Sequence, residues 1–181
     1  MVLLNFNFFT IILALCSMPF AFTYPLMKRF TYWPQLFLGI TFNYGLILGW
    51  TAVKGQIDFI PILFYLGAIF WTLGYDTIYG YQDLKDDEII GLKSTSIKFK
   101  HKPYHLLIIC YSIFLILLFI TGYLMNFNKL SLIIFIITLI QLYYFQLKKL
   151  NIEHSESCLK IFKSNNYLGF IVFVGLLIGK L

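Results

Sequence analysis

The chain contains 181 residues, of which 60% are hydrophobic, 20% are aromatic and only 12% are charged, with a formal net charge of +6. Soluble domains carry roughly 25% charged residues, so this composition excludes a water-soluble globular domain and intrinsic disorder. A spanning helix takes about 20 residues, and about six of them leave no room for a soluble domain. We therefore expect an all-α, polytopic membrane protein that forms a single domain over residues 1–181 within the lipid bilayer.

Six apolar stretches, taken in chain order, predict six membrane-spanning helices. They cover Val2–Thr23, Pro34–Val53, Phe59–Tyr75, Leu106–Met125, Leu130–Leu147 and Tyr167–Ile178. The first stretch differs from a signal peptide, because no positive charge precedes it and its apolar run exceeds the usual length of roughly 7–15 residues. The last stretch is the shortest of the six.

Basic residues indicate the orientation of these spans. Eleven of the 14 lysine and arginine residues lie in the segments that follow the first, third and fifth spans. The positive-inside rule places these segments in the cytoplasm and the start of the chain outside. The positive charge is thus assigned to loops rather than to a nucleic-acid partner. We expect a multi-pass protein of the bacterial inner membrane whose active face is cytoplasmic.

The segment after the third span is unusually acidic. It reads YDTIYGYQDLKDDEIIGLKST over residues 75–95. Five of the eight acidic residues of the chain lie here: Asp76, Asp83, Asp86, Asp87 and Glu88. Acidic side chains are costly near a bilayer, so their concentration at the end of a span suggests a functional site.

The spacing of three of these acids suggests what the site binds. On one continuous helix with about 100° per residue, Asp76, Asp83 and Asp87 point along one stripe, with Gly80 between them and Tyr79 beside them. Carboxylates in a row repel each other, but they suit a hard cation such as Mg²⁺ that is shared with substrate phosphates. Gly80 leaves space for another group to approach the backbone. The alternative is an ordinary solvated loop with acidic residues.

Two further pieces carry positive charge near the same side of the membrane. Lys28 and Arg29 follow the first span; Lys28 can neutralise a phosphate and Arg29 can bind one bidentately, although this piece alone favours a plain positive-inside flank. Lys93 and Ser94 come directly after the acidic run and can reach the same pocket, or they can belong to an ordinary loop or helix start.

At this point the sequence resembles a known family. The segment YDTIYGYQDLKDDEIIGLKST resembles the second aspartate-rich motif of the UbiA prenyltransferases, with the closest likeness to their 4-hydroxybenzoate polyprenyltransferases. The segment YPLMKRFTYWPQLFLGITFNYG resembles the part after the fourth helix of the family. Cys158–Phe162, together with Asn165, Asn166 and Gly169, resembles its final loop and last helix. The resemblance runs across essentially the whole chain in the right order.

The resemblance implies a nine-helix membrane bundle in which Mg²⁺ and two aspartate-rich motifs hold a polyprenyl diphosphate beside an aromatic acceptor such as 4-hydroxybenzoate. It implies three catalytic carboxylates, of which the last two bind the metal and the first orients or activates the acceptor: Asp76, Asp83 and Asp87. It implies substrate contacts for five further residues: Tyr24, Lys28, Arg29, Tyr79 and Lys93. The implied reaction is prenyl transfer in ubiquinone biosynthesis.

One part of the family pattern is absent. The first aspartate-rich motif, NxxxDxxxD, does not occur in the sequence. The six spans correspond to the fourth to ninth helices of the family, so we expect an N-terminally truncated domain whose missing helices a separately encoded N-terminal portion would supply. Two readings stay open: a Mg²⁺-dependent prenyltransferase, or an inactive or split-gene fragment that is a non-catalytic membrane protein. A transporter has no support from an inverted repeat.

Overall fold

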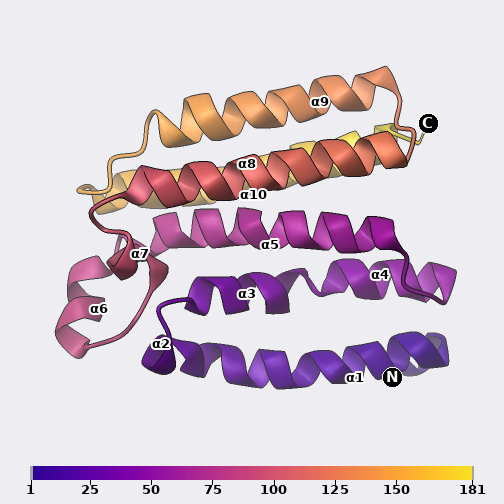
Figure 1. Ribbon diagram of the computed structural model, residues 1–181, viewed down its shortest axis with the longest axis horizontal. Helices are drawn as coiled ribbons and strands as arrows, with labels where there is room; N and C mark the ends of the chain where they lie inside the picture. The colour runs from indigo at the N-terminus through magenta and orange to yellow at the C-terminus, as the bar shows by residue number, and fades with distance from the viewer. Residues whose placement is uncertain (1, 181) are drawn as a thin grey trace.

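A computed structural model describes residues 2–180, and within that range the protein contains helices but no strand (Figure 1). Six helical segments of these residues are long and apolar enough to cross a membrane, which confirms the predicted number. They are Phe8–Phe30, Pro34–Lys54, Phe59–Gly80, Pro103–Leu124, Lys129–Leu147 and Ser155–Ile178. They lie side by side along the long axis of the molecule.

The first two spans are each built from shorter helices. After a 3₁₀ turn, η1 (Val2–Asn5), the first span consists of α1 (Phe8–Thr23), η2 (Tyr24–Leu26) and α2 (Met27–Phe30). The second consists of α3 (Pro34–Asn43) and α4 (Gly45–Lys54), which are separated at Tyr44. Proline is tolerated in the first turn of a helix, where its missing N–H would have no partner, and Pro34 starts α3 in this way.

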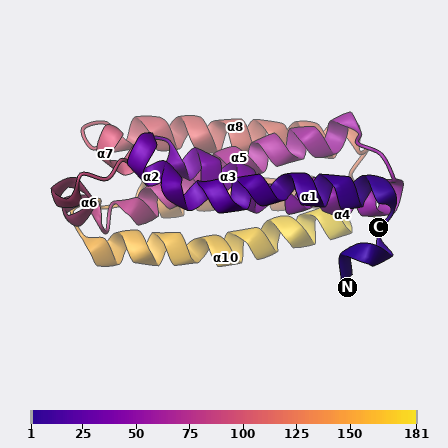
Figure 2. The same ribbon diagram turned by 90° about the horizontal axis from the view of Figure 1, so that it is seen from below.

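The third span, α5 (Phe59–Gly80), is the central helix of the bundle. It contacts α3, α4, α8 (Pro103–Leu124) and α10 (Ser155–Ile178). Figure 2 shows α8 and α10 on opposite sides of the molecule, with α5 between them. The helix extends five residues beyond the predicted end at Tyr75, so Asp76 lies within it.

The last two spans differ in detail from the prediction. The fifth consists of α9 (Lys129–Ile140) and a π-helical segment, η3 (Gln141–Leu147). The predicted start of the sixth span at Tyr167 is wrong, because α10 begins at Ser155. Its first three turns contain many polar residues, which dilute the hydropathy of this part and hid it from a search for apolar runs.

The basic segments gather at one end of the bundle, as the alternation of spans requires. Figure 1 shows α2, the short helices α6 (Leu84–Ile90) and α7 (Thr95–Lys98), and the connection before α10 at the same end. The α4–α5 and α8–α9 connections lie at the other end. We call the first end the lysine-rich end.

Polar contacts join the helices inside the bundle. Tyr111 of α8 donates a hydrogen bond to Gln146 Oε1 over 2.8 Å, and Gln146 donates to Asn165 Oδ1 of α10 over 3.1 Å. Trp71 Nε1 of α5 donates to the same Asn165 oxygen over 2.9 Å. Since lipid offers no hydrogen-bond partner, such groups must pair within the protein, and this network fixes four segments relative to one another.

We predict that Gly74→Ala destabilises the bundle by about 1–3 kcal/mol through overpacking between α5 and α8. An added Cβ would lie 2.6 Å from Cε1 of Tyr111, which is fully buried and cannot retreat without losing its bond to Gln146. The free energy of unfolding in detergent micelles measures the effect. Gly49→Ala is the matched control, because nothing lies within 4 Å of its added Cβ. Equal losses in the two variants would contradict the packing argument.

Candidate functional site

The acidic segment is not one continuous helix, so the predicted single stripe of carboxylates is wrong. Helix α5 ends at Gly80, and Asp83 is the N-cap residue of a separate helix, α6, which contains Asp87. Asp76 therefore belongs to one helix, while Asp83 and Asp87 belong to the next. Their relative positions depend on how the segment folds back onto the bundle, and not on helical spacing alone.

Gly80 marks the point where the segment folds back. A Cβ at Gly80 would collide with Oγ of Ser96, whose hydroxyl donates a hydrogen bond to the carbonyl of Thr77 over 2.9 Å. The close approach to the Gly80 backbone that the sequence suggested is therefore present, but the approaching group is a side chain of the same protein. After this point α6 runs outward and α7 returns to the bundle (Figure 1).

Lys28 brings together two segments that are far apart in the sequence. Its ammonium group lies 3.3 Å from Asp87 Oδ2, and its backbone carbonyl accepts a hydrogen bond from the Lys93 N–H over 2.8 Å. Asp87 is only 7% exposed, so its charge needs a partner. The Lys93 ammonium in turn donates to the carbonyl of Phe30 over 3.4 Å. Three predicted site residues thus form one cluster.

Asp76 lies close to this cluster. It is half-buried near the end of α5, where Lys28 and Tyr24 are its electrostatic neighbours. Tyr24 is itself half-buried at the junction of α1 and η2. Lys28 therefore acts on two carboxylates, Asp76 and Asp87, that come from different helices.

The remaining predicted residues lie outside the cluster. Asp83 is exposed, and its side chain makes no capping hydrogen bond to α6. Arg29 is exposed and forms no ion pair with any described residue. Tyr79 is 40% exposed, and its ring contacts Phe162 of α10 with 4.7 Å between ring centroids. The charged groups of Asp83 and Arg29 are therefore free to contact a ligand, whereas the ring of Tyr79 packs against α10.

Aromatic rings continue from Tyr79 into the bundle. Phe162 also contacts Tyr75, which contacts Trp71, and Trp71 stacks on Phe114 with 5.2 Å between centroids. We call these five residues the aromatic wall. Trp71 and Phe114 line an apolar cavity of about 360 Å³ between α3, α4 and α10. The wall therefore connects the lysine-rich end with an apolar space in the membrane part.

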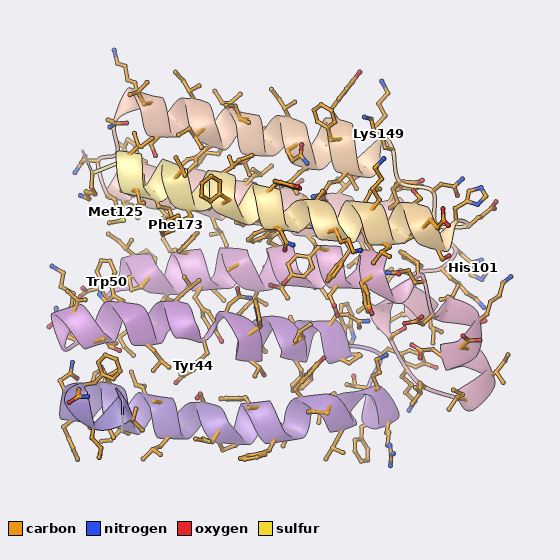
Figure 3. All side chains as sticks on the ribbon, turned by 180° about the vertical axis from the view of Figure 1, so that it is seen from behind. Tyr44, Trp50, His101, Met125, Lys149 and Phe173 are labelled. Carbon is orange, nitrogen blue, oxygen red and sulfur yellow. The ribbon has the colours of Figure 1, made fainter. Side chains whose placement is uncertain are left out.

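A second apolar cavity, of about 330 Å³, adjoins the first and shares four residues of its lining: Gly45, Leu46, Phe64 and Leu176. It extends to Trp50 and Met125. Figure 3 shows Trp50 and Met125 toward the end of the bundle opposite Lys149 and His101. Together the two cavities form an apolar groove that runs away from the charged cluster and suits a long hydrocarbon chain.

Tyr81 is buried directly after α5, and its hydroxyl has no hydrogen-bond partner among the described residues. Burial raises the pKa of Tyr81 above its ordinary value, and the nearby Cys158 and Tyr104 act in the same direction. The phenol therefore stays protonated at neutral pH, which excludes it as a general base.

The chemistry of the site residues fits a shared Mg²⁺ rather than a preformed metal cage. Within residues 2–180 no group of three or more His, Cys, Asp or Glu side chains is arranged to hold a metal ion. Mg²⁺, however, commonly uses one or two carboxylates and takes its other ligands from water and substrate phosphates. Asp87 already faces a cation, the Lys28 ammonium group, and Asp83 offers a free carboxylate nearby in the sequence.

Sequence reasoning missed a group of buried polar residues beneath the acidic segment: Gln35, Thr77, Thr95 and Ser96. The only signal was the run of hydroxyl residues at positions 94–96. Such runs are common at turns and helix starts, so their spacing did not indicate that they meet Gln35 from a helix about 60 positions earlier.

Comparisons with known proteins agree with these features. The sequence profile described as the UbiA prenyltransferase family matches residues 1–174. A mitochondrial 4-hydroxybenzoate polyprenyltransferase of Bos taurus is 41% identical over 184 residues, which cover 99% of this chain and 48% of that protein. The Homo sapiens protein of the same name is 40% identical, with 99% and 48% coverage. 4-Hydroxybenzoate geranyltransferase 2 of Lithospermum erythrorhizon is 40% identical, with 99% and 59% coverage.

Two facts limit these comparisons. The chain spans about half the length of the curated relatives it matches. No solved structure matches the chain. The names of the relatives therefore describe proteins about twice as long as this chain.

We predict a measurable coupling between Lys28 and Asp87 in a double-mutant cycle of Lys28→Met and Asp87→Asn. The free energy of unfolding in micelles should show an interaction of about 0.5–1 kcal/mol, because Lys28 is half-exposed and water screens part of the attraction. A cycle of Lys28→Met with Asp86→Asn is the control, since Asp86 is exposed and forms no ion pair among the described residues. A coupling of equal size in both cycles would contradict the specific contact.

Proposed function

The chain belongs to the UbiA prenyltransferase family, and from this premise we propose that it acts in the Mg²⁺-dependent transfer of a polyprenyl group from a polyprenyl diphosphate to 4-hydroxybenzoate. The single observation that carries the proposal is the charged cluster around Lys28 at the lysine-rich end of a bundle whose membrane part contains an apolar groove lined by Trp71 and Phe114. A diphosphate with a long hydrocarbon tail needs both a charged site and an apolar groove.

Three positive residues would bind the diphosphate: Lys28 and Lys93 of the cluster, and Arg29 outside it. Lys28 and Lys93 are held close together through the backbone, and Arg29 is free of ion pairs among the described residues. An arginine can bind two phosphate oxygens at once, while a lysine acts as a mobile point charge. When a diphosphate enters, Lys28 can turn from Asp87 toward the phosphate oxygens and release this carboxylate.

Asp83 and Asp87 are the residues that would hold Mg²⁺, and the ion would supply charge neutralisation for the leaving diphosphate. Asp83 is exposed and therefore needs little rearrangement to bind. Asp87 is buried and needs a positive partner in every state, which Lys28 provides in this structure.

The chemistry proposed for the cluster is an electrophilic substitution. The bond between the allylic carbon and the bridging oxygen breaks, and the electron pair leaves with the diphosphate, where Lys28, Lys93 and Arg29 stabilise the developing charge. A ring carbon of the acceptor attacks the cationic allylic carbon and forms the new bond. The proton of that ring carbon passes to a nearby base, for which Asp76 is placed beside Lys28.

The aromatic wall supports the same reaction from the side of the membrane. Faces of aromatic rings attract cations, and Tyr75, Tyr79 and Phe162 form the part of the aromatic wall nearest the lysine-rich end. The groove beyond them shields the isoprenoid tail from water. We propose that the reaction takes place at the lysine-rich end and that this end faces the cytoplasm, in line with the positive-inside rule. The place in ubiquinone biosynthesis and in a bacterial inner membrane stays a prediction.

A second candidate function follows from the length of the relatives. Because the chain spans about half of those proteins, it can be a membrane protein that binds a prenyl diphosphate without turning it over, or an inactive or split-gene fragment that needs a separately encoded N-terminal portion. Activity measured with and without such a portion distinguishes these options from an enzyme that is active alone.

We predict that membranes containing the chain, alone or with a candidate N-terminal portion, form prenylated 4-hydroxybenzoate only when Mg²⁺ is present. Asp83→Asn should lower the rate about 100-fold or more, because it removes a charged ligand. Asp86→Asn is the matched control, since Asp86 is also an exposed aspartate and lies on α6, and its rate should stay within about twofold of the wild type. Radiolabelled product is measured by chromatography, with a full-length relative as the positive control. If neither mixture yields product while the relative does, the proposal of an active enzyme fails.

A further inference from the structure

Four buried polar residues form a cluster directly below the acidic segment, which we call the polar latch: Gln35, Thr77, Thr95 and Ser96. Each is at most 4% exposed. Gln35 Oε1 of α3 accepts a hydrogen bond from the Thr95 N–H over 3.0 Å, and the hydroxyl groups of Thr77 and Thr95 are 2.6 Å apart. The latch therefore joins α3, α5 and α7.

Helix α7 depends on these contacts. It has only four residues, from Thr95 to Lys98, and a single turn does not persist alone in water. Two of its first N–H groups are satisfied by side chains, that of Ile97 by Ser94 and that of Thr95 by Gln35. Without Gln35, the Thr95 N–H would be buried with no partner, which costs more than the loss of an average hydrogen bond.

The latch fixes the far end of the acidic segment. The near end is fixed where α5 stops at Gly80, and the far end is fixed at Thr95. Two residues before Thr95, the Lys93 N–H bonds to the carbonyl of Lys28, whose ammonium group holds Asp87. A shift of α7 would therefore change the position of Asp87 as well.

We propose that Gln35 is a positioning residue for the acidic segment: by accepting the Thr95 N–H, it sets the place of α6 and so the approach of its carboxylates to a diphosphate ligand. Gln35 acts through Thr95, and its amide nitrogen lies next to Gly80, 3.4 Å from where a Cβ would be. Its role in ligand binding rests on the proposed function, whereas its role in holding the segment can be tested without any ligand.

The test uses the full chain in lipid nanodiscs and three variants. Gln35→Met keeps the length of the side chain but removes the acceptor. Gln35→Glu retains an acceptor oxygen, and a carboxyl group buried at this position stays in its uncharged, protonated form. Asn128→Leu is the matched control, because Asn128 also accepts a backbone N–H, that of Ser131, but at the opposite end of the bundle. Hydrogen exchange of residues 81–96 is measured by mass spectrometry. Binding of farnesyl thiodiphosphate, an unreactive prenyl diphosphate, is measured with and without Mg²⁺.

For Gln35→Met we expect exchange of residues 81–96 to rise about tenfold and Mg²⁺-dependent binding to weaken about tenfold. Gln35→Glu should stay near the wild type in both measurements, and Asn128→Leu should leave residues 81–96 unchanged. Unchanged exchange in Gln35→Met, or an equal rise in Asn128→Leu, overturns the positioning role. Raised exchange with unweakened binding also overturns it. If the wild type does not bind the probe, the proposed function fails, and the exchange data alone decide whether Gln35 holds the segment.

Discussion

The lack of hydrogen-bond partners in lipid shapes the interior of this bundle. Any polar group that leaves water must pair within the protein, because the hydrocarbon region offers neither donors nor acceptors. In the middle of the bundle, Gln146 and Asn165 meet this requirement through Tyr111 and Trp71. At the lysine-rich end the polar latch meets it with backbone groups. The need to pair buried polar groups thus fixes the helices relative to one another, and through the polar latch it also fixes the acidic segment.

The candidate site uses this rigid base to hold charges at the edge of the membrane. Lys28 is the central group, since it contacts Asp87 directly, acts on Asp76 through space and binds Lys93 through its backbone. Its own helix, α2, is a short extension of the first span, so the lysine can adjust without moving the bundle. A lysine on a flexible four-carbon side chain, held by a fixed frame, suits the proposed exchange of Asp87 for a diphosphate.

The sequence predicted the spans because their signal is local. Apolar runs of about 20 residues indicate membrane helices wherever they occur, and six were found. The prediction from sequence was wrong where the structure depends on contacts between residues far apart in the chain. The stripe through Asp76, Asp83 and Asp87 required a continuous helix, but Ser96 packs against Gly80 and the chain turns there. The polar latch was not predicted for the same reason, because Gln35 and Thr95 are in contact only in the folded chain. The start of α10 was missed since its first turns are polar.

The charges of the predicted site explain why a divalent cation belongs to the proposed chemistry. The three acidic residues Asp76, Asp83 and Asp87 are matched in number by three basic residues, Lys28, Arg29 and Lys93, so the formal charges of these six side chains sum to zero. A diphosphate would add about two or three negative charges to a region beside the low-dielectric membrane. Charge without a compensating partner is costly there. Of the three basic groups only Lys28 is ion-paired among the described residues, so its use by the phosphates would leave the buried Asp87 carboxylate without a positive partner. Asp83 and Asp87 would hold a divalent cation, which would supply the missing positive charge and leave the three basic residues to bind the leaving group.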